Sequence, residues 1–240
     1  MDPKLPSIHF VIPCAGVGSR SGRQLPKQYA DLAGRPMIAH TLKVLLEVKS
    51  IQSICLVVSP SDVYIGDILQ NHVKDTDGKI SVIFKGGNTR AQSVLAGLEH
   101  LQIMGAAKED WALVHDAARC LITDELINDL ISSCFKDSVG GLLALPVADT
   151  LKQEAGGRVK NTIPRENKWL AQTPQMFRLE MLVKALSSSL SISSESITDE
   201  SSAIESLGLQ PLLIKGRSTN LKITYPEDFE MAEAILKLRS

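Results

Sequence analysis

The sequence FVIPCAGVGSRSGRQLPKQY, residues 10–29, joins a short apolar strand to a loop that contains Gly16 and Gly18. An apolar run of strand length followed by a polar turn is the pattern with which many α/β folds begin. Small residues let backbone amides approach an anion closely, so we expect this loop to wrap phosphate groups. The side chains of Arg20 and Lys27 would add two positive charges to balance those phosphates.

Two other nucleotide-binding motifs do not fit this loop. The pattern GxxxxGK[ST] is absent from the chain, and Ser21 stands where the dinucleotide pattern GxGxxG ends in glycine. The simpler alternative, in which the glycines only allow a tight turn with positive φ, stays open for the loop taken alone. The neighbouring Arg20 and the sequence PKQ favour phosphate binding.

The strand-then-helix pattern recurs along the chain and predicts the fold class. The expected strands are residues 8–12, 53–59, 80–84, 111–114 and 140–147. The expected helices are residues 36–47, 88–104, 123–134 and 226–238. Near-continuous apolar strands such as SICLVV and WALVH suit a parallel sheet that helices cover on both faces. We therefore predict an α/β protein with a Rossmann-like, doubly wound and mostly parallel sheet.

Residues 150–168 interrupt this pattern. They carry charge, a Gly-Gly pair and no amphipathic helical stripe, so we expect a hairpin arm that protrudes from the sheet. Such an arm cannot easily bury itself against its own core, and we predict that it pairs with a second subunit in a homodimer. Residues 187–196 are rich in serine and are predicted to be a solvated loop after a helix. The chain is short enough for one core, so residues 1–240 are expected to form a single domain.

Composition and charge exclude several classes of protein. With 44% hydrophobic and 22% charged residues, the chain is expected to fold around a sizeable core. The net charge of -1 offers no general attraction for polyanions, so nucleic acid is not an expected partner. The four cysteines show no CxxC spacing and are expected to be free thiols in a reducing cytoplasm. No apolar run approaches the roughly 20 residues of a bilayer span, so we expect no membrane partner.

A carboxylate follows the strand WALV within the sequence VHDAAR, residues 114–119. Asp116 is therefore expected at the carboxyl edge of the sheet, where open α/β folds bind ligands, and it is a candidate ligand of Mg²⁺. A role as a helix cap or turn residue is the alternative for Asp116. His115 is expected to be packed or hydrogen-bonded, because no second histidine or cysteine stands at metal-site spacing.

Further short blocks follow one another between residues 8 and 233. They are PCAGVGSR, LPKQY, LAGRPMIAHTL, GGNTRAQSVLAGL, VHDAAR, PVADTLK, AQTPQMF, TDESSAIE and NLKITYPEDFEMAE. In this order the blocks resemble the 2-C-methyl-D-erythritol 4-phosphate cytidylyltransferase family. The first block is shared with many sugar nucleotidyltransferases, whereas TPQMF, TDE and NLKIT together point to the methylerythritol family. The resemblance implies one nucleotidyltransferase domain that uses Mg²⁺ and has the arm at its dimer interface.

The resemblance also implies roles for particular residues. Nucleotide binding is implied for Pro13, Cys14, Ala15, Gly16, Gly18, Arg20, Lys27, Gly87, Asn88, Ser93 and Asp116. Acceptor binding is implied for Ala117, Arg119, Thr150, Arg165, Thr173, Thr198 and Lys222. The implied catalytic cations are Arg20, Lys27, Arg165 and Lys222. Asp116 would hold the metal.

Several of these residues also have simpler interpretations. Asn88 could cap the helix that follows it, and relatives carry an acidic residue at this position. Arg165 could form only a surface ion pair, and Lys222 could be an outward lysine in the strand-like run NLKIT. The chain also has Cys14 where alanine is usual and Cys120 where proline is usual, and neither change removes a charged group.

The implied reaction is an in-line attack by the phosphate oxygen of methylerythritol phosphate on the α-phosphorus of CTP. It would release pyrophosphate and form 4-diphosphocytidyl-2-C-methyl-D-erythritol for the non-mevalonate isoprenoid pathway. Because a phosphate monoester is already ionised near neutral pH, alignment and charge neutralisation would supply the catalysis. Two alternatives are a cytidylyltransferase for another polyol phosphate, such as ribitol 5-phosphate, and a noncatalytic nucleotide-binding regulator.

Overall fold

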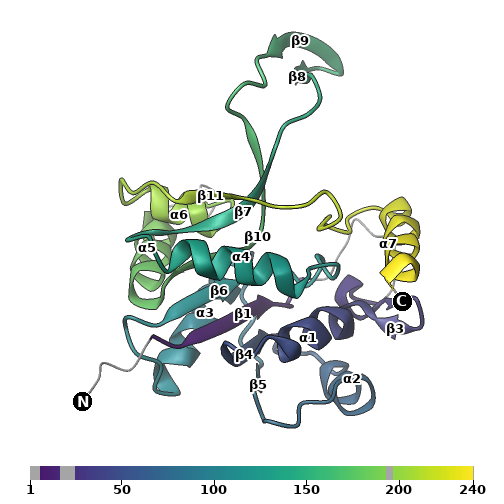
Figure 1. The fold of residues 1–240 in the computed structure, drawn as a ribbon, viewed down its shortest axis with the longest axis vertical. Coiled ribbons are helices and arrows are strands. Elements are labelled where there is room, and N and C mark those ends of the chain that lie inside the picture. The colour runs from purple at the N-terminus through teal and green to yellow at the C-terminus, as the bar shows by residue number, and fades with distance from the viewer. Residues whose placement is uncertain (1–5, 17–24, 193–196, 240) are drawn as a thin grey trace.

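A seven-stranded sheet forms the centre of the computed structural model, which describes residues 6–16, 25–192 and 197–239. The strands are β1 (Ile8–Pro13), β4 (Ile51–Val57), β5 (Ile80–Ile83), β6 (Trp111–Val114), β7 (Gly140–Pro146), β10 (Trp169–Arg178) and β11 (Leu212–Lys215). Their order across the sheet is β11-β7-β10-β6-β1-β4-β5 (Figure 1). β10 runs antiparallel to both of its neighbours, and the other pairings in this sheet are parallel.

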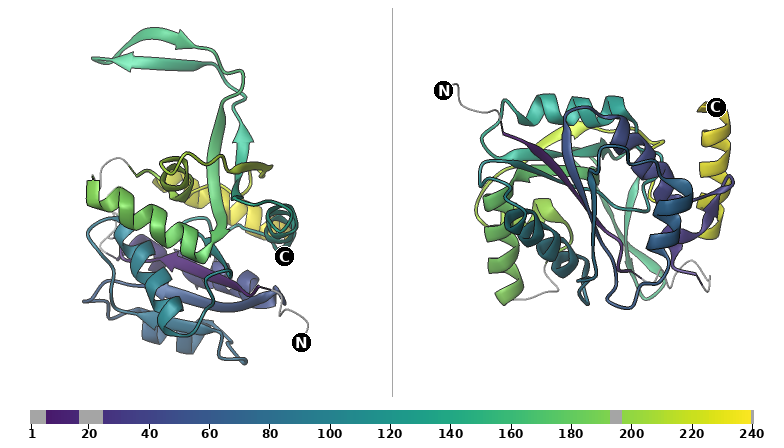
Figure 2. Two further views of the ribbon diagram at one scale, coloured as in Figure 1. Left: turned by 90° about the vertical axis from the view of Figure 1, so that its left-hand side faces the viewer. Right: turned by 90° about the horizontal axis from the view of Figure 1, so that it is seen from below.

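Helices cover both faces of this sheet (Figure 1, Figure 2). One face carries α1 (Met37–Glu47), α2 (Ile65–His72) and α4 (Asp124–Cys134). The other face carries α3 (Arg90–Ile103), α5 (Leu179–Ile192) and α6 (Glu200–Glu205). Alternation along β1 separates the two layers, because Phe10 and Ile12 pack with the first group of helices whereas Val11 packs with the second. The predicted doubly wound, mostly parallel α/β sheet is confirmed.

The C-terminal helix packs on a small two-stranded sheet. These elements are α7 (Pro226–Arg239), β2 (Asp31–Leu32) and β3 (Arg35–Pro36). Phe229 of α7 shares a hydrophobic cluster with Leu32 and with Ile223 from the preceding loop. The backbone amide of Ile223 also donates to the carbonyl of Ala118 at 2.9 Å. These contacts hold the loop that carries Lys222 beside the end of β6.

The arm predicted at residues 150–168 is an antiparallel hairpin. Its strands are β8 (Leu151–Ala155) and β9 (Arg158–Ile163). Gly156 and Gly157 form the turn with φ of 61° and 75°, values that favour glycine. Figure 1 shows the hairpin standing away from the body on two long connections, and its residues are largely exposed. The protruding arm is confirmed, whereas its pairing with a second subunit stays a prediction.

Part of the serine-rich stretch predicted as a loop differs in the structure. Residues 187–192 are helical and belong to α5, because Ser189 is buried and its hydroxyl bonds that of Ser206 at 3.0 Å. The rest of that serine-rich stretch, residues 193–196, lies outside the described residues. Residues 220–224, whose run NLKIT is strand-like in sequence, form an irregular loop, and the buried Asn220 side chain donates to the carbonyl of Thr173 at 2.9 Å.

The helix predicted from Asn88 begins at Arg90, and Thr89 is its N-cap. The Thr89 hydroxyl accepts from the backbone amide of Gln92 at 3.2 Å, and the Gln92 side chain accepts from the backbone amide of Thr89 at 3.1 Å. This reciprocal pair is a capping box. The alternative that Asn88 caps α3 is therefore wrong.

Cys14, Cys55, Cys120 and Cys134 are buried and free, as expected. Burial raises the pKa of each thiol, so these side chains stay protonated at neutral pH. In the described parts of the chain, no helix has the length and hydropathy that a bilayer crossing needs.

Candidate active site

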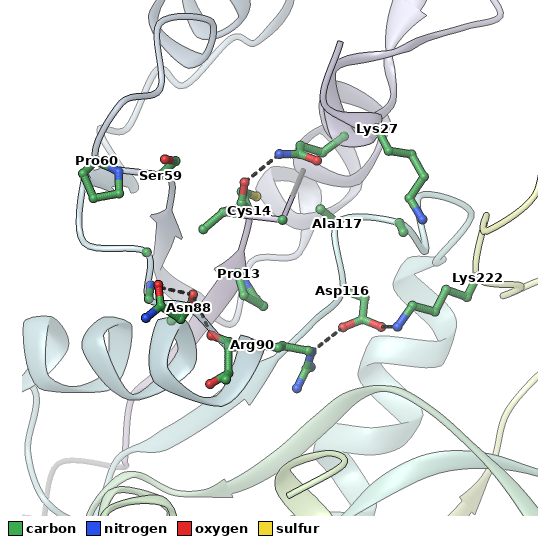
Figure 3. A pocket seen from close by; sticks show the side chains of 18 residues that line it. Pro13, Cys14, Lys27, Ser59, Pro60, Asn88, Arg90, Asp116, Ala117 and Lys222 are labelled. Carbon is green, nitrogen blue, oxygen red and sulfur yellow. Dashed lines mark hydrogen bonds and ion pairs between the residues drawn. The ribbon is translucent and has the colours of Figure 1, made fainter. Parts of the chain in front are cut away.

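A cavity of about 640 Å³ opens where β1, β4, β5 and β6 end (Figure 3). It is lined by Pro13, Cys14, Ala15, Gly16, Lys27, Gln28, Ser59, Pro60, Gly86, Gly87, Asn88, Thr89, Arg90, Ser93, Asp116, Ala117, Ala118 and Lys222. The loops that follow parallel strands meet at one edge of a sheet, and open α/β sheets bind ligands there. The cavity therefore lies where the sequence predicted a ligand site.

Two glycines let the loop after β5 lie close to the loop after β1. Gly86 donates its amide to the carbonyl of Val58 at 2.8 Å, and an added Cβ at Gly86 would lie 2.2 Å from the Cβ of Ala15. An added Cβ at Gly87 would lie 2.5 Å from that of Gln92. Side chains at these two positions would collide with their neighbours, so this wall of the cavity is backbone.

Asp116 lies on the cavity wall just beyond β6 and is held from three directions. Its backbone amide donates to the hydroxyl of Thr173 at 3.0 Å. Its Oδ1 accepts from Arg90 Nε at 2.8 Å, and its Oδ2 accepts from Lys222 Nζ at 2.8 Å (Figure 3). Burial alone would raise the pKa of this carboxyl, but Arg90 and Lys222 outweigh burial and hold the pKa well below its usual range. Asp116 is therefore ionised at neutral pH.

His115 supports Asp116 through a chain of hydrogen bonds. Its Nε2 lies 3.2 Å from the carbonyl oxygen of Arg119, which can only accept, so Nε2 carries the proton. Nδ1 then accepts from the hydroxyl of Thr173 at 3.0 Å, and that hydroxyl accepts from the amide of Asp116. Burial lowers the pKa of His115 to about 4, which keeps the ring neutral. His115 is hydrogen-bonded, as expected.

Lys27 lies on the same side of the cavity as Lys222 (Figure 3). It begins the 3₁₀ helix η2 (Lys27–Tyr29), and its ammonium donates to the carbonyl of Ile223. The next side chain, Gln28, is buried and donates to the carbonyl of Cys14 at 2.6 Å. The PKQ sequence thus ties the segment after the glycine-rich loop to the end of β1 and to the loop before α7.

Most of the predicted nucleotide-binding residues line one cavity. Those that line it are Pro13, Cys14, Ala15, Gly16, Lys27, Gly87, Asn88, Ser93 and Asp116. Gly18 and Arg20 lie outside the described residues. The Ser93 hydroxyl accepts from the amide of Gly87 at 3.1 Å and donates to the carbonyl of Thr89, so it braces the glycine wall.

The predicted acceptor residues are divided between the cavity and the surface. Ala117 and Lys222 line the cavity, and Thr173 braces Asp116 from behind. The other predicted contacts, Thr150, Arg165 and Thr198, are exposed and are not part of the cavity lining. The Arg165 guanidinium donates to the carbonyl of Ala148, and the backbone amide of Thr198 donates to the hydroxyl of Ser202 at 3.1 Å.

Arg119 is partly buried and lies next to Asp116. Its Nη1 and Nη2 donate to the carbonyls of Asn220 at 2.8 Å and Ala171 at 3.2 Å. Its Nε lies 4.0 Å from Asp116 Oδ2 and has no hydrogen-bond partner among the described atoms. Arg119 thus adds positive charge beside Asp116, with its terminal nitrogens bound to backbone.

Several residues that the structure brings to this site were not predicted from the sequence. Arg90 bonds Asp116 from the start of α3, and Glu200 of α6 bonds Arg90 in turn. Gln28, Gly86 and the loop after β4 also contribute to the cavity. Arg90 and Glu200 stand inside the blocks GGNTRAQSV and TDESSAIE, which was the available signal, but they are 110 residues apart. Only the folded sheet brings them together.

Fold and cavity together define the class of protein. A mostly parallel sheet carries a glycine-walled cavity at its carboxyl edge, with Lys27, Lys222 and an ionised Asp116 around it. Fixed cations and a single carboxylate suit a phosphate-rich ligand that arrives with a divalent metal ion. The chain has an α/β fold of nucleotidyltransferase type.

Comparison with known proteins narrows this class to one family. A family model described as 2-C-methyl-D-erythritol 4-phosphate cytidylyltransferase matches residues 8–238. The chain is 48% identical over 229 residues to the 2-C-methyl-D-erythritol 4-phosphate cytidylyltransferase of Laribacter hongkongensis, and the match covers 95% of each chain. It is 51% identical over 235 residues to the bifunctional enzyme IspD/IspF of Albidiferax ferrireducens, with 98% of this chain and 54% of that relative covered.

Solved structures agree with the sequence matches. The crystal structure of a 4-diphosphocytidyl-2C-methyl-D-erythritol synthase is similar with a TM-score of 0.84 and 36% identity, over 98% of this chain and 100% of that one. The 2-C-methyl-D-erythritol 4-phosphate cytidylyltransferase of Francisella tularensis gives a TM-score of 0.80 and 32% identity, over 95% and 99%. The chain belongs to the 2-C-methyl-D-erythritol 4-phosphate cytidylyltransferase family.

Proposed function

We propose that the chain transfers the cytidylyl group of CTP to 2-C-methyl-D-erythritol 4-phosphate and releases pyrophosphate. The observation that supports this most is the gathering of Lys27, Asp116 and Lys222, from three separate segments, around one cavity in a member of this family. The product, 4-diphosphocytidyl-2-C-methyl-D-erythritol, would serve the non-mevalonate isoprenoid pathway. Ribitol 5-phosphate remains the alternative acceptor to be tested.

Mg²⁺ fits this cavity as a cofactor held by one carboxylate. The described residues include no group of three or more histidine, cysteine, aspartate or glutamate side chains placed to hold a metal ion. Mg²⁺ needs only one or two carboxylates when phosphate oxygens and water complete its shell. Each oxygen of the ionised Asp116 accepts one bond from a cation and keeps a further lone pair. When bound there, Mg²⁺ would neutralise charge on the phosphates.

The nucleotide is proposed to lie between the two loops at the ends of β1 and β5. Residues 13–16 and Lys27 would follow the triphosphate, with Arg20 from outside the described residues as a second cation. Gly87, Asn88 and Ser93 would lie beside the cytosine and the ribose. This placement lets the positive charges stabilise the charge that builds on the α- and β-phosphates.

Alignment of the acceptor is the other task that we assign to this chain. Lys222 has a side chain that is 41% exposed, and it is proposed to direct the acceptor phosphate toward the α-phosphorus of CTP. No side chain has to remove a proton, because the phosphate monoester is ionised near neutral pH. His115 is therefore given no role as a base, which agrees with its burial and its pKa of about 4.

The arm is proposed to complete the acceptor half of the site in a homodimer. Thr150 and Arg165 lie at its base, outside the cavity lining of their own chain. Apolar side chains on the arm and at the adjoining start of β10, Val159 and Leu170, are exposed and would be covered by a second subunit. We also propose a cytoplasmic location, which the four free thiols favour.

A pyrophosphate-release assay with each of the four nucleoside triphosphates tests the proposed function. Methylerythritol phosphate and ribitol 5-phosphate are supplied in parallel, with Mg²⁺ or with a chelator. We expect release only with CTP, methylerythritol phosphate and metal together. Faster release with ribitol 5-phosphate would favour the other acceptor, and CTP binding without release under any condition would favour a noncatalytic regulator.

A further inference from the structure

The Arg90 guanidinium joins two carboxylates at the edge of the cavity. Its Nε donates to Asp116 Oδ1 at 2.8 Å, while Nη1 and Nη2 donate to the two oxygens of Glu200 at 2.6 and 3.1 Å. The Glu200 side chain is 0% exposed. We propose that Glu200 is a positioning residue: it holds Arg90 so that the Asp116 carboxylate stays available to the metal ion that accompanies the nucleotide. The inference rests on the proposed function of Asp116 as the metal ligand.

Glu200 is itself held in place by the sheet. It follows Asp199, the N-cap of α6, whose carboxylate accepts from the Gln175 side chain at 2.9 Å. The backbone amide of Ser201 donates to Gln175 Oε1 at 2.8 Å. Gln175 lies on β10, the strand that also carries Thr173 and so braces the backbone of Asp116. One strand therefore sets the positions of both carboxylates that Arg90 joins.

Arg90 bonds its two carboxylate partners in different ways. A guanidinium prefers to grip a carboxylate with two parallel bonds, and such a grip would cover both oxygens of Asp116. In the structure, Glu200 accepts from both terminal nitrogens of Arg90, while Asp116 accepts from its Nε. With its terminal nitrogens held by Glu200, Arg90 bonds one oxygen of Asp116, and Lys222 bonds the other.

The charges around Asp116 point to the same role. Arg90, Lys222 and the Arg119 guanidinium all lie close to this carboxylate, and each opposes the approach of a metal cation. Burial raises the pKa of the Glu200 carboxyl, whereas Arg90 bonds both of its oxygens and favours the ionised form, whose negative charge offsets Arg90. Removing the Glu200 charge would leave Arg90 free to neutralise Asp116, and metal affinity should fall.

The experiment measures Mn²⁺ binding by electron paramagnetic resonance in the presence of CTP and the absence of acceptor, so it does not depend on turnover. Glu200→Gln keeps the shape of the side chain but removes its charge, and we expect Mn²⁺ binding about tenfold weaker than in the unmodified protein. Arg90→Gln removes the opposing cation, and binding should be at least as tight as in the unmodified protein. In Arg90→Gln/Glu200→Gln, binding should recover to within about threefold.

The two single variants are expected to change Mn²⁺ affinity in opposite directions, which distinguishes a positioning role of Glu200 from a role in stabilising the fold. If the pair only stabilised the fold, both single variants would weaken binding and the double variant would not recover. That outcome, or an unchanged Glu200→Gln, would overturn the proposal. If Glu200→Gln does not fold, as judged by thermal melting, Arg90→Gln and the double variant still decide the sign. If Asp116→Asn binds Mn²⁺ as tightly as the unmodified protein, Asp116 is not the metal ligand and this inference fails with that assignment. A loss of CTP turnover without a change in Mn²⁺ binding would count against the proposed function but not against the binding result.

Discussion

The cavity and the arm are built in opposite ways. In the cavity, Asp116 is buried, and both its carboxylate and its backbone amide are bonded. In the arm, Thr150 and Arg165 are exposed, and the Arg165 guanidinium reaches only as far as the carbonyl of Ala148 in the same segment. Folding of one chain therefore fixes the nucleotide half of the proposed site. The proposed acceptor half includes Thr150 and Arg165, which do not line the cavity of their own chain.

This difference predicts two separable kinds of defect. Side chains that the sheet edge fixes should affect the chemistry on CTP, because their geometry is set by folding alone. Side chains on the arm should affect only the use of the acceptor, because we propose that a second subunit sets their position.

Asp116→Asn is expected to have the largest effect. It removes the charge that would hold Mg²⁺, so pyrophosphate release should fall by about a thousandfold or more. The protein should stay folded, because Asn keeps the side-chain shape and Arg90 keeps its bonds to Glu200. The rate is measured together with a thermal melting curve. A folded Asp116→Asn protein with full activity would exclude Asp116 as the metal ligand.

Lys27→Ala should lower kcat by several hundredfold, roughly as for a lost transition-state donor, while the Kd for CTP changes little. The reason is that Lys27 is proposed to meet charge that builds only during the transfer. Single-turnover rates and CTP titrations separate the two quantities. Lys43→Ala, on the exposed face of α1, is the matched control and should leave both unchanged. Unaltered turnover in Lys27→Ala would refute the assigned role.

Arg165→Ala should lower kcat/KM for methylerythritol phosphate about fiftyfold, because a charged donor to the acceptor phosphate is lost. The Kd for CTP and the melting temperature should not change, since Arg165 is exposed and lies outside the cavity. Arg158→Ala, also exposed on the arm but at the start of β9, is the control. Weaker CTP binding in Arg165→Ala would contradict the division between arm and cavity.

Acid should weaken the sheet edge through His115. The unfolded chain binds a proton near the ordinary pKa of 6.5, whereas burial lowers the pKa of the folded protein to about 4, so stability is lost as pH falls between these values. The loss from pH 7 to pH 5 should be about 2 kcal/mol. Denaturant unfolding at both pH values measures it. His115→Gln, which is neutral throughout, should show a smaller loss, and an equal loss would remove His115 as its source.

Local sequence signals were enough to predict the sheet and one side of the cavity. The strand that ends at Pro13, the aspartate after WALV and the Gly-Gly turn of the arm each depend on short-range preferences that the folded chain keeps. Lys222 lines the cavity, but its strand-like run NLKIT did not indicate this position, which only the resemblance of that block to the family suggested. The alternating pattern of NLKIT does not produce a strand. The Asn220 side chain is held by a hydrogen bond to the carbonyl of Thr173, and Ile223 is buried in the hydrophobic cluster that includes Phe229 of α7.

Long-range pairing could not be predicted in this way. Arg90 and Glu200 meet because β10 inserts between β6 and β7 and carries the start of α6 with it. Nothing in a single sequence ties two charges 110 residues apart. Thr89, not Asn88, is the N-cap of α3, because Thr89 and Gln92 form the reciprocal hydrogen bonds of a capping box. These outcomes depend on geometry that only the complete fold supplies.

The division between cavity and arm is tested most directly by mixing the two defects. Asp116→Asn and Arg165→Ala chains carry different tags, are produced together, and the mixed dimer is purified. If the arm of one subunit serves the cavity of the other, one site in the mixed dimer is intact, and its activity should be about half that of the unmodified dimer. Activity no higher than that of the two parent variants, or failure to isolate a mixed dimer, would contradict the account.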